Sequence, residues 1–338
     1  MPATIVVNAL WGDSGKGKIA AFIALKEKAS FSVRAGTGTN AGHSIYFEDD
    51  TEIRTRQLPC GWLPRDTLLR VGSGVAVDPE IFLAEVEKYG LTSRTRVDFR
   101  CPIITPEYRE REKRDTHLAN TVGSVCSGTG VAQAEFVMRR ARQARDLPEL
   151  SEFLTDLPLE INSACSQGEH VVIECSQGTH LSLALSEDYP CCTSDNCTSV
   201  AAADDVGLNW QHIREVVLVV KASPSRVGTG PLPFEMRPED EDERGIAEYG
   251  VATGRRRRKA SEISWEHLKT SVMLNGPTQI ALTFCDHFDT TVTGIRNEGD
   301  LSTSVKDLID KVQEETGVPV TLVETGKFFG DIIQLNRA

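Results

Sequence analysis

The chain has 338 residues, of which 40% are hydrophobic and 25% are charged, a composition that excludes a disordered or fibrous protein. Asp and Glu total 49 against 37 Lys and Arg, for a net charge of −12. Such a surface repels phosphate backbones, so nucleic acid is not an expected partner, and any bound phosphate needs a local site.

The hydropathy and cysteine patterns point to a cytoplasmic protein with no membrane partner. No apolar run approaches the roughly 18 residues of a membrane-spanning helix, and residues 1–13 carry no basic leader or cleavage site. The 9 cysteines follow no zinc-ligand spacing, which favours free thiols in a reducing compartment. We assign these thiols no function.

Apolar runs alternate with helical patterns along the whole chain. The runs predict strands over 4–10, 68–71, 170–174, 215–221, 279–284 and 318–323. The helical patterns lie at 16–28, 79–89, 134–145, 150–166, 264–274 and 302–315. Because most runs are continuously apolar, they are typical of parallel strands buried on both faces. We therefore predict a single α/β domain over 1–338, with a largely parallel central sheet flanked by helices and the charged segment 238–244 as a surface insertion.

The first predicted strand runs into WGDSGKGKIAAF, which predicts a nucleotide-binding core like a P-loop. Gly12, four residues, Gly17 and Lys18 have the spacing of a phosphate loop, in which backbone N–H groups and a helix N-terminus surround the phosphates. Ile19 stands where a Mg²⁺-binding hydroxyl usually follows, so Asp13 is the replacement ligand that we expect. The alternative is a glycine turn that serves packing alone.

Two further segments have the composition of ligand loops. In RAGTGTNAGHS (34–44), small residues flank Asn40 and His43, and the histidine is either a satisfied loop residue or an acid beside phosphate. In VATGRRRRKA (251–260), Arg255 and Arg257 would point the same way from an extended loop and form a fork for carboxylate or phosphate. A solvated charge run and a nucleic-acid patch are the alternatives for the second segment.

Together these segments resemble the adenylosuccinate synthetase family. The resemblance covers nearly the whole chain in order, and the length is similar to that of the short archaeal form. The motifs that carry it are WGDSGKGK, GTNAGHS, GSVCSGTG, ECSQGTHL, YPCCTSDNCT, SRVGTGPLPFE, EYGVATGRRRR, LTFCD and ETGK. The family is a class of carbon–nitrogen ligases that join L-aspartate to C6 of a 6-oxopurine nucleoside monophosphate, driven by a nucleoside triphosphate.

The resemblance implies roles for individual residues. Asp13 matches the base that takes the N1 proton so that O6 attacks the γ-phosphate, giving a 6-phosphoryl intermediate. Asp13 also matches a Mg²⁺ ligand together with Gly42. His43 matches the acid, and Lys16 and Gln177 complete the implied catalytic set.

Binding residues carry over in the same way. For the monophosphate they are Asn40, Ser124, Val125, Arg139, Gln177, Thr193 and Arg255. For the triphosphate they are Ser14, Gly15, Lys16, Gly17, Lys18, Gly42, His43, Asp286 and Gly326. For aspartate they are Thr253, Arg255 and Arg257. Arg139 matches an arginine that reaches the partner subunit's site, which implies a homodimer.

Departures from the family pattern lead to a more specific hypothesis. Ser14 stands where the family has glutamate, and the donor pocket carries Phe284 and Glu324 in place of lysine and serine. These changes resemble the bacteriophage branch that acts on dGMP with ATP or dATP and makes 2-amino-2'-deoxyadenylosuccinate. The smaller Ser14 would leave room for the guanine 2-amino group. The alternative is the ordinary enzyme acting on IMP with GTP.

Two other classes remain open from the sequence. A regulatory nucleotide-binding module would have lost catalysis, which Asp13, His43 and Gln177 disfavour. A P-loop kinase is disfavoured because Ile19 replaces the usual hydroxyl and no second carboxylate motif follows a partner strand.

Overall fold

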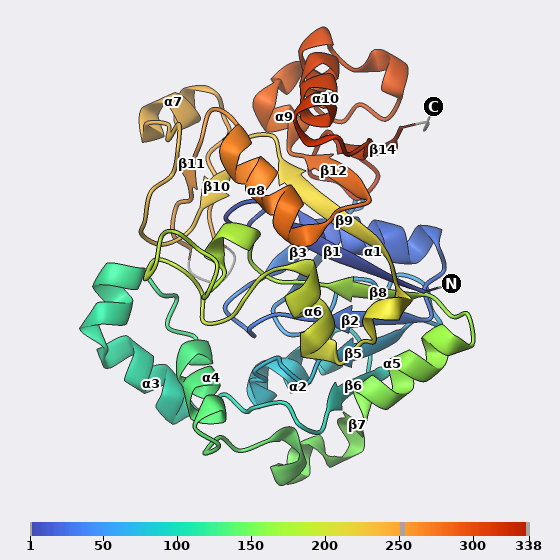
Figure 1. The fold of residues 1–338 in the computed structure, drawn as a ribbon, viewed down its shortest axis with the longest axis vertical. Helices are drawn as coiled ribbons and strands as arrows, with labels where there is room; N and C mark the ends of the chain where they lie inside the picture. Colours follow the sequence, from blue (N-terminus) through green and yellow to red (C-terminus); the bar gives the residue numbers. More distant parts are fainter. Residues whose placement is uncertain (1, 251–253, 336–338) are drawn as a thin grey trace.

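A central β-sheet with helices on both faces forms the molecule, as Figure 1 shows. The computed structural model describes residues 2–250 and 254–335. Ten strands run in the order β14-β13-β12-β9-β1-β8-β2-β5-β6-β7, and every neighbouring pair is parallel except β13 with β14. The strands are β1 (Ala3–Asn8), β2 (Phe31–Arg34), β5 (Leu68–Val71), β6 (Thr95–Asp98), β7 (Leu154–Thr155), β8 (Val171–Glu174), β9 (Ile213–Lys221), β12 (Gln279–Thr283), β13 (Val320–Glu324) and β14 (Ile332–Gln334). The α/β prediction with a largely parallel sheet is confirmed.

The helices cover the sheet on both sides because alternate residues of each strand point to opposite faces. Ile5 and Val7 of β1 pack in one cluster with α5, α6, α8 and α10, whereas Val6 packs in another with α1. The helices are α1 (Lys16–Lys26), α2 (Pro79–Lys88), α3 (Pro106–Arg114), α4 (Thr129–Val137), α5 (Leu157–Ser166), α6 (Ser199–Val206), α7 (Pro238–Glu243), α8 (Trp265–Asn275), α9 (Cys285–Phe288) and α10 (Thr303–Thr316). None of the described helices is long and apolar enough to cross a membrane.

Two short antiparallel pairs stand outside the main sheet. The hairpin of β3 (His43–Tyr46) and β4 (Glu52–Thr55) follows the second glycine-rich segment and places His43 at its start. The pair of β10 (Ser225–Arg226) and β11 (Arg258–Lys259) anchors the far end of the arginine segment. Both pairs support loops that follow the carboxyl ends of central strands.

Two predicted helices were wrong at their boundaries. The helix expected over 134–145 is α4, which begins at Thr129 and ends at Val137, and Arg139 follows at φ 59°. The helix expected over 150–166 divides into a 3₁₀ turn at Pro148–Phe153, the short strand β7 and α5, which has a proline in its first turn. Proline is tolerated only in a first turn, so Pro158 places the beginning of α5 later than the helical pattern indicates.

The charged segment 238–244, predicted as a surface insertion, contains the helix α7 over Pro238–Glu243. Most of its side chains are solvated, but Glu241 is buried and pairs with Arg256 at 3.0 Å. This contact joins α7 to the arginine segment near the site.

Candidate active site

The phosphate-loop turn lies between β1 and α1, where strand and helix leave a tight connection. Gly12 and Gly15 have φ angles of 97° and 74°, which favour glycine, and Asp13 adopts a φ of 48°. Gly17 lies so close to the next loop that an added Cβ would be 2.7 Å from the Cβ of His43. The lack of a side chain at Gly17 therefore lets this turn pack closely against the loop that carries His43.

A cavity of about 830 Å³ opens beside this turn, at the carboxyl edge of the parallel strands. Parallel α/β sheets bind ligands at this edge. The structure brings many of the predicted site residues to the wall of this cavity: Asp13, Ser14, Gly15, Lys16, Gly17, Asn40, Gly42, His43, Ser124, Val125, Gln177, Thr193 and Arg257.

A hydrogen-bonded chain of side chains links three of the loops. Lys16 Nζ donates to the backbone carbonyl of Gln177 at 2.7 Å, and Gln177 Nε2 donates to Asn40 Oδ1 at 2.8 Å. Asn40 Nδ2 in turn donates to Thr193 Oγ1 at 3.2 Å. Burial lowers the pKa of Lys16. The predicted acceptor contacts thus form one network with the phosphate-loop lysine.

His43 belongs to a buried cluster of charged side chains. Its Nδ1 donates to Glu174, and Arg34 Nη1 donates to the same carboxylate oxygen at 2.9 Å. Burial lowers the pKa of His43 to about 4, although Glu174 opposes this shift. Burial alone would raise the pKa of Glu174, but His43 and Arg34 hold it at about 2. The imidazole is therefore neutral at neutral pH and its carboxylate partner is ionised.

Arg34 and Glu174 are functional-site residues that were not predicted from the sequence. They end β2 and β8 and are directly opposite each other in the parallel register. The sequence signal that could have identified them is a charged residue at the end of each of these two strands. His43, Cys60 and Glu174 also place potential metal-ligand atoms within 4.8 Å of one another, but Arg34 already neutralises the carboxylate.

Asp13 faces the arginine segment across the cavity. Arg257 Nε lies 2.5 Å from Asp13 Oδ2. Arg255 is exposed and does not line the cavity, so the two arginines do not form the expected fork in this structure. Thr253 lies outside the described residues.

Lys18, Asp286 and Gly326 gather at a neighbouring site rather than along the cavity. Lys18 Nζ lies 2.9 Å from Glu324 Oε1 and donates to the carbonyl of Gly326 at 2.6 Å. The second oxygen of Glu324 accepts the backbone N–H of Phe284 at 2.6 Å. Burial, with Glu324 nearby, raises the pKa of Asp286 to about 6. The residues predicted for the donor base thus lie together, and the lysine predicted for its phosphates is bound among them.

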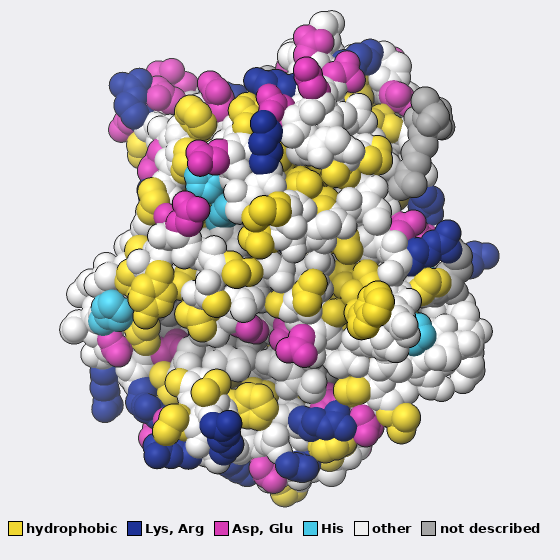
Figure 2. Space-filling model, in the orientation of Figure 1, with side chains coloured by type: hydrophobic (Ala, Val, Ile, Leu, Met, Phe, Trp, Pro, Cys, Tyr) yellow, Lys and Arg dark blue, Asp and Glu magenta, His cyan; other side chains and the backbone are white. Residues whose placement is uncertain are grey.

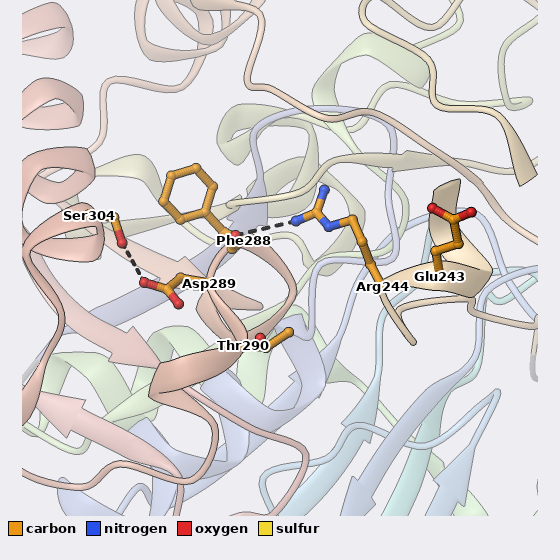
Figure 3. A pocket seen from close by; sticks show the side chains of 6 residues that line it. All are labelled: Glu243, Arg244, Phe288, Asp289, Thr290 and Ser304. Carbon is orange, nitrogen blue, oxygen red and sulfur yellow. Dashed lines mark hydrogen bonds between the residues drawn. The ribbon is translucent and has the colours of Figure 1, made fainter. Parts of the chain in front are cut away.

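A second and smaller hollow, of about 420 Å³, lies between α7, α9 and the start of α10 (Figure 3). Arg244 reaches across it and donates to the carbonyl oxygens of His287 at 2.8 Å and Phe288 at 3.3 Å. Asp289 accepts from Ser304 on the other side. None of the predicted site residues lines it, so the large cavity is the candidate active site.

Comparison with known proteins agrees with this geometry. The family model described as adenylosuccinate synthetase matches residues 5–158 and 147–293. The chain is 43% identical over 337 residues to the adenylosuccinate synthetase of Archaeoglobus fulgidus, covering 100% of this chain and 99% of that protein. The chain belongs to the adenylosuccinate synthetase family. It is therefore a member of a family of carbon–nitrogen ligases.

Other relatives extend the comparison. The adenylosuccinate synthetase of Methanocaldococcus jannaschii is 42% identical over 340 residues, with 100% of this chain and 98% of that protein covered. The fully ligated enzyme from Plasmodium falciparum has a TM-score of 0.89 at 19% identity, covering 99% of this chain and 100% of that one. The succinoaminodeoxyadenylate synthetase of cyanophage S-2L, solved with dGMP and dATP, has a TM-score of 0.81 at 23% identity, covering 99% and 96%. At these identities the two structures support the fold alone.

Proposed function

We propose that the chain joins L-aspartate to C6 of a 6-oxopurine nucleoside monophosphate, driven by a nucleoside triphosphate. The observation that carries this proposal is the convergence of Asp13, Lys16, His43 and Gln177 on one cavity with Arg257. These residues supply a base, a phosphate-binding cation, an imidazole and a carboxylate-binding arginine. Positioning and charge neutralisation of this kind account for most of the rate in phosphoryl transfer.

The proposed reaction has two steps. Asp13 takes the N1 proton of the acceptor base while O6 of that base attacks the γ-phosphorus of the donor, and the nucleoside diphosphate leaves. The amine of aspartate then attacks C6, loses a proton, and phosphate leaves. In the structure Arg257 forms an ion pair with Asp13. A carboxylate of the incoming aspartate would pair with Arg257 instead, which would free Asp13 to act as the base.

Magnesium is the proposed cofactor, and the residues fit it. The Asp13 carboxylate and the backbone of Gly42 line the same cavity and offer the hard oxygen ligands that this ion prefers. When bound, the ion would neutralise charge on the transferred phosphoryl group. Asp13 must exchange Arg257 for the ion to serve as its ligand.

The relatives at 39–43% identity are named adenylosuccinate synthetases, and the family resemblance associates that activity with IMP as the acceptor and GTP as the donor. The Ser14 site favours a second candidate, dGMP. Ser14 lines the cavity, is 1% exposed, and its Oγ has no hydrogen-bond partner among the described residues. A free hydroxyl there would accept a hydrogen bond from a 2-amino group, which IMP lacks.

The donor pocket likewise supports two candidate donors, an adenine nucleotide (ATP or dATP) and GTP. Phe284 and the buried Glu324 stand where the family resemblance expects lysine and serine. The base of the donor nucleotide would therefore contact different side chains in its pocket. Asp286 and Gly326 remain the proposed contacts to the base. Lys221 Nζ lies 4.1 Å from the centre of the Phe284 ring and holds it in place.

The proposal includes a homodimer in which Arg139 reaches the partner's site. Arg139 is exposed just beyond α4, next to the exposed apolar side chains of Val137 and Met138. Figure 2 shows further hydrophobic side chains spread over the face that α6 and α8 cover in Figure 1. Mixing an Arg139→Leu protein with an Asp13→Asn protein tests the arrangement, because only a shared site regains activity in the mixture.

The deciding experiment measures phosphate release with Mg²⁺ and L-aspartate, using IMP or dGMP as acceptor and GTP, ATP or dATP as donor. Release that requires aspartate and is lost in Asp13→Asn supports the ligase reaction. A preference for IMP supports the reading from the relatives, and a preference for dGMP supports the reading from Ser14. No aspartate-dependent release with any pair would refute the proposed function.

A further inference from the structure

Glu112 is a buried acidic residue at the end of a solvated helix. Helix α3 carries seven charged residues in the segment PEYREREKR, but only Glu112 is buried, at 2% exposure. In the part of the chain that the structure describes, Glu112 forms no ion pair, whereas Arg109 and Arg111 of the same helix do. Buried carboxylates without a cation need hydrogen bonds that satisfy both oxygens.

Backbone N–H groups at the start of α4 provide those hydrogen bonds. Gly128 donates to Glu112 Oε2 at 2.7 Å, and Gly130 and Val131 donate to Oε1 at 2.7 and 3.2 Å. These are the donors that a helix leaves unsatisfied at its N-terminus, where an anion normally binds. Glu112 thus occupies that anion position from within the protein.

The segment that Glu112 holds also forms part of the cavity wall. Ser124, Val125, Thr129 and Gly130 line the cavity together with Glu112 itself. The other end of this segment is fixed by the backbone of Ser124, which donates to the carbonyl of Leu118 at 2.9 Å. The segment 123–131 is therefore held at both ends, and Glu112 provides the charged contact at one of them.

We propose that Glu112 is a positioning residue for the acceptor nucleotide. Its carboxylate fixes the conformation of residues 123–131, against which the monophosphate would bind. Because Glu112 already accepts from the backbone N–H groups at the start of α4, those groups are not available to the phosphate. The phosphate is then met by side chains such as Ser124 and Asn40 rather than by a helix N-terminus. This inference rests on the proposed function, in which the monophosphate lies against 123–127.

The test compares Glu112→Gln with Glu110→Gln. Glu110 lies on the same helix but is exposed and pairs with Lys113 at 2.8 Å. We expect Glu112→Gln to raise the KM and the calorimetric Kd for the acceptor by about tenfold, because one charge-assisted hydrogen bond is lost. The kcat and the KM values for donor and aspartate should stay within about twofold of those of the parent protein. Glu110→Gln should match the parent protein in all of these. An equal loss in every parameter, or an unchanged acceptor KM, would overturn the inference.

Chemical rescue gives a readout that does not depend on turnover. Glu112→Ala empties the anion position, so formate or inorganic phosphate should bind there and raise its Tm more than chloride does at equal ionic strength. Formate should also lower its acceptor Kd, whereas neither anion should distinguish Glu110→Ala from the parent. No selective effect of formate would overturn the role of the carboxylate. If the parent protein binds neither IMP nor dGMP, the proposed function fails, and formate rescue of Tm would then show a structural cap without a nucleotide role.

Discussion

The Lys18–Glu324 contact predicts that one of the two phosphate-loop lysines stabilises the fold instead of binding phosphate. Both side chains are buried, with 5% and 6% of their areas exposed. Lys18→Met would leave the Glu324 carboxylate with the backbone N–H of Phe284 as its hydrogen-bond donor. Removing one member of a buried pair costs about 3–5 kcal/mol, because the other charge remains desolvated.

The size of the chain converts that cost into a melting shift. For 338 residues the unfolding entropy is about 0.7 kcal/mol per kelvin, so Lys18→Met should lower Tm by roughly 4–7 °C. Replacing both partners in Lys18→Met/Glu324→Leu removes the uncompensated charge and should recover about half of the shift or more. Lys269→Met is the matched control, because Lys269 pairs with Glu315 at 2.6 Å on the surface and should change Tm by less than about 1 °C.

Differential scanning fluorimetry and donor kinetics together decide the question. If Lys18 contacts the donor phosphates, Lys18→Met should leave Tm nearly unchanged and raise the donor KM strongly, and the double variant should be no better. That pattern would contradict a stabilising role for the buried Lys18–Glu324 pair.

Three further outcomes follow from the site. His43→Asn should flatten the dependence of the unfolding free energy on pH between about pH 6.5 and 4. Because the pKa of His43 is lowered in the folded protein, the unfolded chain takes up the proton first, and the parent loses about 3 kcal/mol of stability as the pH falls. If urea unfolding gives the same pH dependence for the variant and the parent over that range, this prediction is wrong. Asp13→Asn should lower kcat by about 10²–10⁴ while calorimetry shows retained monophosphate binding, and a normal kcat would exclude Asp13 as the base. Gly17→Ala should abolish activity, since its Cβ would meet the Cβ of His43 at 2.7 Å and Cys60 Sγ at 2.9 Å, and kinetics at parent level would show that this loop can move aside.

The central strands were predictable because their signal is local. Runs such as 68–71 and 215–221 are mostly apolar, and the structure places both in the sheet, as β5 and within β9. Two strands that were not predicted, β2 and β6, are four residues long and end at charged residues, Arg34 and Asp98. Each mixes polar and apolar residues within four positions, so it resembles a loop unless its neighbours in the sheet are known.

The beginning of α4 shows why the remaining error was not local. The residues around Gly128 contain three glycines and small polar residues, which disfavour a helix, and the expected helix therefore began later in the chain. The structure begins the helix there because Glu112, 16 residues earlier, satisfies the first N–H groups. A cap supplied by another helix leaves no mark in the capped sequence.

The site follows the same division between local and distant information. Glycine spacing identified the loop after β1, and the small residues beside Asn40 and His43 identified the loop after β2; the structure places both loops on the wall of one cavity. The pairing of charges depends on strand order instead: β8 lies between β1 and β2, so Glu174 meets Arg34 and His43, which precede it by more than a hundred residues. The same order places β12 next to β9 and β13 next to β12, and Glu324 at the end of β13 lies within reach of Lys18 in the first turn of α1. The family resemblance implies two lysines that bind phosphate, Lys16 and Lys18, whereas the strand order of the sheet pairs Lys18 with a carboxylate.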